Sequence, residues 1–64
     1  MADFRPDVVR KLREHNCYFK RHAKGDHELW FSPITAVAFV VDHKILSRHT
    51  ANGIMKQAGI PHKF

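Results

Sequence analysis

The spacing of apolar residues near the start of the chain predicts a helix. Val8 and Leu12 stand four residues apart, so they fall on one side of an α-helix and form an apolar stripe among charged neighbours. Pro6 suits the first turn of such a helix, and Asn16 suits its end because asparagine tolerates left-handed backbone. We therefore expect a helix over residues 6–15.

A different pattern follows, in which short apolar runs are separated by turn-forming residues. We expect strands over residues 17–22, 27–31 and 36–41, and we expect the last of them, AVAFVV, to be the most buried. The links at 23–26 and 32–35 contain a glycine and a proline, which are typical of turns. Links this short predict an antiparallel meander.

The C-terminal part returns to helical spacing after a connection over residues 42–50. Ser47 or Thr50 could cap the start of this helix by accepting a hydrogen bond from a free backbone N–H. Gly53 lies inside the helix and weakens it, and a close approach to the sheet is one reason for a glycine there. The apolar residues of one face are Ala51, Ile54, Met55 and Ala58.

The end of this second helix is clearly signalled. Gly59 fits the left-handed stop of a helix, Ile60 can fold back on Met55, and Pro61 prevents continuation. The order of elements is therefore α-β-β-β-α, in a single α+β domain over residues 1–64. Because each helix has one apolar stripe, we expect both to cover one face of a three-stranded antiparallel sheet. The other face should be open, basic and histidine-bearing.

The charge of the chain favours a polyanionic partner. Eleven Lys and Arg against six Asp and Glu give a formal charge of +5, and six histidines can add to it below neutral pH. Such a balance is typical of proteins that bind nucleic acid or an acidic protein. A membrane partner is not expected, since no apolar run approaches the roughly 20 residues of a span. The N-terminal MADFRPD lacks the features of a signal peptide.

The chain has one cysteine, Cys17, so it has no intramolecular disulfide framework. A single thiol fits a reducing compartment, which points to the cytoplasm. Cys17 could be a nucleophile beside a base, but free cysteine is usually a small buried filler, and we expect that role.

His27 is the main candidate for chemistry. It follows the turn residues Gly25 and Asp26 and opens a predicted strand, so the turn could present its imidazole to a ligand. An imidazole titrates near neutrality and can act as general base or general acid. The plain alternative is a surface histidine beside a turn. His43, after the third strand, is either a second acid/base group near the same face or a solvated loop histidine.

Basic residues gather around His27 in the sequence. As phosphate contacts they would give affinity for RNA without choice of sequence, and the alternative is a solvated basic face. We expect Trp30 to lie on the open face, where it could stack a base or anchor a partner protein. The candidate RNA-binding residues are Lys20, Arg21, His22, Lys24, Trp30, Lys44 and Arg48.

The histidines also raise the question of metal binding. His22 and His27 could meet across the first hairpin and form part of a zinc site. Against this, the chain has no cysteine cluster and no pair of histidines at helical i,i+4 spacing with an acid partner. We therefore expect neither a metal nor another cofactor.

Taken in order, these motifs resemble the HicA family of bacterial toxins. The likeness runs from about Pro6 to Ile60, and this chain has Asp26 where the family commonly has serine. The residues that carry the resemblance are Gly25-Asp26-His27, Val40, His43, Thr50, Ile54 and Lys56-Gln57-Ala58-Gly59-Ile60.

The resemblance implies a fold similar to the double-stranded-RNA-binding domain and a bacterial, cytoplasmic mRNA interferase. It implies metal-independent cleavage of mRNA, with His27 as the catalytic residue and assistance from His43 as an open question. It also implies neutralisation by a HicB antitoxin encoded beside the toxin. Two alternatives remain at this level: a non-catalytic RNA-binding module of the same shape, and a protein-interaction domain whose basic face docks an acidic partner.

Overall fold

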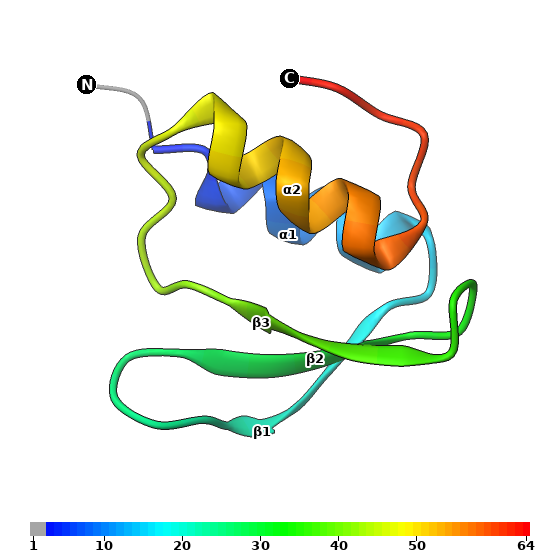
Figure 1. The fold of residues 1–64 in the computed structure, drawn as a ribbon, viewed down its shortest axis with the longest axis horizontal. Coiled ribbons are helices and arrows are strands. Elements are labelled where there is room, and N and C mark those ends of the chain that lie inside the picture. Colours follow the sequence, from blue (N-terminus) through cyan, green and yellow to red (C-terminus); the bar gives the residue numbers. More distant parts are fainter. Residues whose placement is uncertain (1–2) are drawn as a thin grey trace.

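A computed structural model of the chain describes residues 3–64, so the expectations for Met1 and Ala2 lie outside the described residues. Both helices lie on the same side of an antiparallel sheet (Figure 1), as the apolar stripes predict. The α+β fold and its α-β-β-β-α order are confirmed. The elements are α1 (Arg5–Glu14), β1 (Tyr18–His22), β2 (Glu28–Ser32), β3 (Val37–Val41) and α2 (Arg48–Ala58).

The strands form a meander in the order β1-β2-β3, with β2 in the centre. Glu28 pairs with Val41 and Ser32 pairs with Val37, so β2 and β3 are in regular register. The pairing of β1 with β2 contains an irregularity between Phe19 and Arg21. The prediction that the third strand is the most buried is wrong. The most buried strand is β2, because a central strand has a neighbour on each side and β3 is at an edge.

The first helix and its exit follow the sequence signals. Val8 and Leu12 are fully buried, and Asn16 adopts a left-handed φ of 65° at the end of the helix. The N–H of Cys17 then donates to the carbonyl of Leu12 at 2.9 Å. Cys17 is itself buried, which confirms its expected role as a core filler.

The second helix begins and ends as predicted. Ser47 is the cap, because its Oγ accepts hydrogen bonds from the N–H groups of the first turn, including that of Thr50 at 3.4 Å. Gly59 has a φ of 76°, and the N–H of Ile60 donates to the carbonyl of Met55 at 2.9 Å.

Close helix packing does not account for the glycine inside α2. A Cβ built on Gly53 would meet open space, so the suggested close approach to the sheet is absent. Nothing in the structure explains the choice of glycine there.

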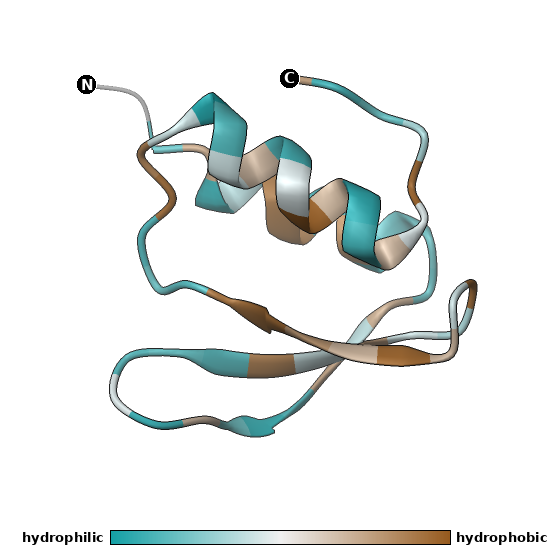
Figure 2. Cartoon of the chain, in the orientation of Figure 1, coloured by the Kyte–Doolittle hydropathy of each residue, from teal (hydrophilic) through white to brown (hydrophobic). Residues whose placement is uncertain are grey.

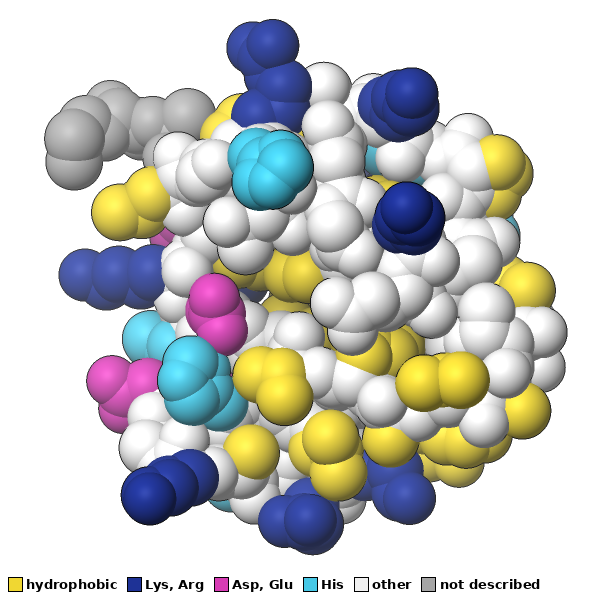
Figure 3. All heavy atoms as spheres, viewed as in Figure 1, with side chains coloured by type: hydrophobic (Ala, Val, Ile, Leu, Met, Phe, Trp, Pro, Cys, Tyr) yellow, Lys and Arg dark blue, Asp and Glu magenta, His cyan; other side chains and the backbone are white. Residues whose placement is uncertain are grey.

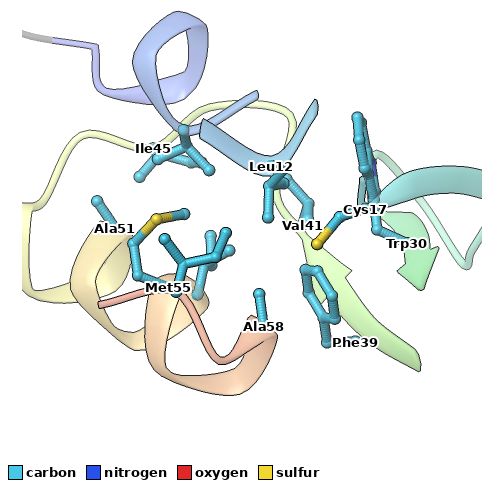
Figure 4. Packing of buried hydrophobic residues seen from close by; sticks show 12 residues of the cluster. Leu12, Cys17, Trp30, Phe39, Val41, Ile45, Ala51, Met55 and Ala58 are labelled. Atoms are coloured by element: carbon cyan, nitrogen blue, oxygen red, sulfur yellow. The ribbon is translucent and has the colours of Figure 1, made fainter. Parts of the chain in front are cut away.

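The core fills the space between the helices and the sheet (Figure 4). Figure 2 shows hydrophobic residues recurring along both helices and along the strands. Among the described residues, no helix is long and apolar enough to cross a membrane. The buried hydrophobic residues are Val8, Leu12, Cys17, Trp30, Phe39, Val41, Ile45, Ala51, Ile54, Met55, Ala58 and Ile60.

Trp30 belongs to this core, so its predicted place on the open face is wrong. Its exposed fraction is 2%. The strand runs from Glu28 to Ser32, and alternate side chains of a strand point to opposite faces. Glu28, Trp30 and Ser32 therefore face the helices, and Leu29 and Phe31 face the other side.

The end of β2 at Ser32 is fastened to the end of α2. The buried Ser32 Oγ donates to the carbonyl of Ala58 at 2.6 Å and accepts from the N–H of Ile34 at 3.2 Å. Thr35 Oγ1 donates to the preceding carbonyl of α2, that of Gln57, at 3.1 Å. A Cβ on Gly59 would lie only 2.8 Å from Thr35 Cγ2, so the turn after β2 fits closely around this glycine.

Candidate active site

His27 lies at the closing end of the hairpin between β1 and β2. Gly25 has a φ of 69°, a left-handed conformation that glycine adopts at little cost, as the sequence predicts for this turn. The N–H of Ala23 donates to the carbonyl of His27 at 2.9 Å and closes the hairpin. His27 precedes Glu28 directly, so it continues the row of Leu29 and Phe31 on the open face.

The imidazole of His27 is held by a carboxylate from the neighbouring strand. Its Nδ1 lies 2.8 Å from Oδ1 of Asp42, which follows β3 directly. The side chains remain 52% and 41% exposed, respectively. A carboxylate at Nδ1 fixes a proton on that nitrogen and orients the ring, which leaves Nε2 available to a ligand.

Asp42 is not among the residues predicted from the sequence, because its position opposite His27 depends on the register of the strands. Glu28 pairs with Val41, so the residues just beyond them, His27 and Asp42, come opposite each other. The backbone of Asp42 is also fixed, because Arg5 Nη1 donates to its carbonyl at 2.9 Å.

Arg5 also supports the site from the helix side of the sheet. Its Nη2 donates to both carboxylate oxygens of Glu28, at 2.9 and 3.0 Å, and Trp30 Nε1 donates to Glu28 Oε1 at 2.9 Å. Burial raises the pKa of Glu28, but the hydrogen bonds from Trp30 and Arg5 outweigh it, so the pKa is lowered overall. The residue next to His27 is thus an ionised carboxylate held by two donors.

A shallow hollow of about 390 Å³ surrounds the pair. Figure 3 shows histidine and acidic side chains close together at the left end of the sheet. Lys44 provides a cation beside two carboxylates, and His43 provides a second imidazole. The lining residues are Asp26, His27, Asp42, His43 and Lys44.

Most of the chain matches one known protein family. Residues 5–60 match the family described as HicA toxin of bacterial toxin-antitoxin. The chain belongs to the HicA toxin family. It is therefore the toxin component of a toxin–antitoxin system, in a family that is generally of ribonuclease type. No curated protein and no solved structure matches the chain.

In this HicA family member, the predicted RNA-binding residues do not all share one surface. Lys20 lies over the open face, with Nζ 5.7 Å from the centroid of the Phe31 ring. Arg21 pairs with Leu29 and so shares that face, and Lys24 is exposed in the hairpin turn. Lys44 lines the hollow around His27.

Besides Trp30, which is in the core, two further members of the predicted set lie elsewhere. His22 pairs with Glu28, and its ring packs against Phe19 with centroids 5.1 Å apart, beside a hollow that Trp30 also lines. His22 is therefore on the helix side of the sheet. Arg48 begins α2 and belongs to the helix layer.

The same arrangement separates the two histidines considered for zinc. His22 faces the helix side with Glu28, whereas His27 bonds to Asp42 on the open side. Within residues 3–64, no group of three or more His, Cys, Asp or Glu side chains could hold a metal ion.

The open face of this toxin is more apolar than the sequence predicted. Beside Lys20 and Arg21, it carries Leu29 and Phe31 of β2 and Val40 of β3, and the paired strands place these side chains next to one another. The prediction of a basic face overlooked this. Following every second residue along the second strand from His27 would have placed the apolar Leu29 and Phe31 on this face.

A larger groove lies away from His27. It has a volume of about 800 Å³ and runs between α2 and the C-terminal residues. It shares no lining residue with the hollow around His27. No Asp or Glu lines this groove, so it has no histidine paired with a carboxylate as His27 is paired with Asp42. The size of a hollow alone therefore does not identify the active site. The groove is lined by His49, Asn52, Gly53, Lys56, Ile60, Pro61, His62 and Lys63.

Proposed function

We propose that this toxin cleaves mRNA as a metal-independent endoribonuclease and that His27 is its catalytic residue. One observation carries the proposal: the imidazole is oriented by Asp42 at 2.8 Å and is still 52% exposed. A histidine held in this way is ready to exchange a proton with a ligand that arrives from solvent. A structural histidine would more commonly be buried and fully hydrogen-bonded.

The chemistry needs one base and one acid. A base removes the proton of the ribose 2′-hydroxyl, the 2′-oxygen forms a bond to phosphorus, and the bond from phosphorus to the 5′-oxygen breaks. The acid gives a proton to that leaving oxygen. The products are a 2′,3′-cyclic phosphate and a free 5′-hydroxyl. No redox step and no added reactant are required.

His27 and His43 line one hollow and can divide these roles. We assign the base to His27, because Asp42 fixes its ring orientation and leaves Nε2 for the 2′-hydroxyl. His43 is then the candidate acid for the 5′-oxygen. Lys44 lines the same hollow and offsets the two carboxylates that would otherwise repel phosphate.

The neutralising partner follows from the same geometry. A HicB-type antitoxin must cover His27 or block the approach of RNA to it. Its contact surface should be acidic, because the open face next to the site carries Lys20 and Arg21 and the hairpin turn carries Lys24. Since it would bind only the folded toxin, it should also raise the apparent stability of this small domain.

The decisive experiment replaces His27 with glutamine, which keeps a polar side chain of similar reach but cannot transfer a proton at neutral pH. We expect the cleavage rate to fall by roughly 10²- to 10⁴-fold. The free energy of unfolding should change by about 1 kcal/mol or less, because about half of the side chain is exposed and it packs against little else. His49→Gln, an exposed histidine on α2, is the matched control and should cleave normally.

The measurement is the rate of cleavage of a defined RNA, together with growth arrest in bacteria and a thermal unfolding curve. A 2′-deoxy sugar at the cleaved position should block the reaction in the wild type, and excess EDTA should not. A folded His27→Gln variant that cuts at the normal rate would contradict the proposal. RNA binding without cleavage by the wild type would identify a non-catalytic binding module.

A further inference from the structure

The open face of the sheet continues directly from the His27–Asp42 pair. Next along the same face come Leu29 and Val40, which pair with each other. Phe31 follows and pairs with Tyr18 across the hairpin. The reactive end and the apolar face therefore form one surface. Figure 3 shows hydrophobic side chains over the part of the molecule where the strands lie in Figure 1, with lysine and arginine at its edge.

We infer that this face binds the unpaired bases of single-stranded RNA, and that Tyr18 and Phe31 are the side chains on which bases stack. The inference rests on the proposed function, since it assigns the class of RNA that reaches His27. Trp30 is in the core, so the inference assigns stacking instead to Tyr18, which is exposed, and to Phe31, which is partly buried on the open face.

The two rings are arranged as an aromatic platform. Their centroids are 5.6 Å apart with planes inclined at 42°, and the Tyr18 residue is 51% exposed. Every base has a flat π face, so stacking on such rings accepts any sequence. The platform therefore predicts affinity for unpaired strands with little choice of base.

The cations at this face complement the RNA backbone. Lys20 Nζ lies 5.7 Å from the Phe31 ring centroid, and Arg21 shares the face through its pairing with Leu29. Phosphate groups beside stacked bases would pair with these charges. An apolar protein surface docked there would have to remove both cations from water without a partner, which is costly. The face therefore suits a polyanion with exposed rings better than an apolar protein.

The distance along β2 fits a short run of nucleotides. Phe31 is four residues from His27, which corresponds to roughly 13 Å along an extended strand. A phosphate at His27 and bases on the aromatic rings can thus belong to neighbouring nucleotides of one strand. Bases inside a duplex are already stacked and paired, so they cannot offer their faces to the platform. We expect duplex RNA to bind more weakly and to be cut more slowly.

The test measures binding in a His27→Gln background, so that the RNA stays intact. The probe is a fluorescent unstructured RNA of ten nucleotides, titrated beside a hairpin RNA of similar length. Tyr18→Leu and Phe31→Leu should each weaken binding of the unstructured RNA by about 10-fold. Tyr18→Phe keeps the ring and should bind like the background protein.

Phe19→Leu is the matched control, because Phe19 is the next residue on the same strand and packs toward Trp30 on the opposite face. It should leave affinity unchanged within about 2-fold. Thermal unfolding of each variant checks the fold, and the half-exposed Tyr18 can be replaced even if Phe31→Leu proves unstable.

Three outcomes would overturn the inference: no loss for Tyr18→Leu and Phe31→Leu, equal loss for Phe19→Leu, or tighter binding of the hairpin RNA. If the two variants lose binding to the antitoxin and keep binding to RNA, the face is a protein-docking surface instead. Failure of the proposed function looks different, since a wild type that binds RNA through the platform but never cuts it would contradict only the catalytic role of His27.

Discussion

Each end of β2 has a hydrogen-bonded polar side chain, Ser32 at one end and His27 just before the other, and the two hydrogen bonds serve different purposes. At the Ser32 end, a buried hydroxyl bonds to the carbonyl of Ala58 at 2.6 Å and fastens the sheet to α2. At the other end, His27 bonds to Asp42 at 2.8 Å and both side chains stay open to solvent. A hydrogen bond at the first end secures the fold. A hydrogen bond at the second orients a group that can react.

Burial decides which role a hydrogen bond takes. A buried polar group must be satisfied, and losing its partner costs the full desolvation of the group that remains. An exposed pair can exchange its partner for water at little cost, so it contributes little to stability. We therefore expect changes at the Ser32 end to alter folding and changes at the His27 end to alter activity.

The largest effect on folding is expected from Gly59→Ala. The alanine would have to adopt a φ of 76°, with its Cβ about 2.8 Å from Thr35 Cγ2. Left-handed strain and overpacking together should lower the free energy of unfolding by about 2–4 kcal/mol. Gly25→Ala separates the two causes, because its φ is 69° but its Cβ would meet open space. Chemical denaturation of both variants measures the difference.

Gly53→Ala is the control for the glycine series. It lies in regular helix with open space around its Cβ, so it should raise the free energy of unfolding by up to about 1 kcal/mol. Equal destabilisation by all three substitutions would show that the close fit around Gly59 is unimportant.

A smaller loss is expected from Ser32→Ala. The change leaves the carbonyl of Ala58 and the N–H of Ile34 without the hydroxyl that they share. The free energy of unfolding should fall by about 1–3 kcal/mol. Cleavage per folded molecule should be unchanged, as determined at a temperature where the variant is fully folded. Loss of cleavage in the folded variant would break the distinction between the two ends.

Asp42→Asn tests the exposed end. The amide cannot supply the charge that orients the ring, so the cleavage rate should fall by about 10-fold, the equivalent of 1.4 kcal/mol in the barrier. The midpoint of thermal unfolding should change little. Nitrogen NMR of the His27 ring reports which nitrogen carries the proton, and this should change in the variant. A normal rate with a changed ring signal would show that the orientation of His27 does not matter.

The smallest expected effect is a change in stability at acidic pH. The pKa of Glu28 is lowered overall, so its ionised form is stabilised in the folded chain. This stability is present above the ordinary pKa of 4.5 and is lost as the pH falls through the lower folded value. Glu28→Gln should therefore be less stable than wild type at pH 7, and the difference should shrink below about pH 4.5. Chemical denaturation of both proteins at a series of pH values measures this difference.

Much of the fold could be predicted because its signals are local. The cap at Ser47, the left-handed residues Asn16 and Gly59, and the glycine turn before His27 each depend on a few neighbouring residues. The order of elements and the shared side of the helices follow from these signals and from apolar spacing. The resemblance to HicA proteins rests on the same short motifs, and the family match confirms it.

The features that the sequence did not predict depend on which residues of a strand face the helices and on contacts between residues distant in sequence. Trp30 was expected on the open face together with His27, but alternate residues share a face, so an outward His27 puts Leu29 and Phe31 on the open face and Trp30 in the core. Asp42 reaches His27 only through strand pairing, fifteen positions further along the chain. Arg5 of α1 contacts Glu28 of β2 only because the helix packs on the sheet, 23 positions apart in the chain. The catalytic role of His27 remains a prediction.

The regular pairing of β2 with β3 limits how the chain can vary in length. A residue inserted into the turn at 33–36 would have to loop out, because a register shift of one would move Asp42 to the helix side and turn Phe39 and Val41 out of the core. The turn also fits closely around Gly59, so a longer loop there would disturb the contact of Thr35 with the end of α2. Among natural variants of this toxin, length changes in that turn should therefore be rarer than length changes at the hairpin tip. The hairpin tip near Lys24 precedes both partners of the pair, so length changes there need not disturb their pairing.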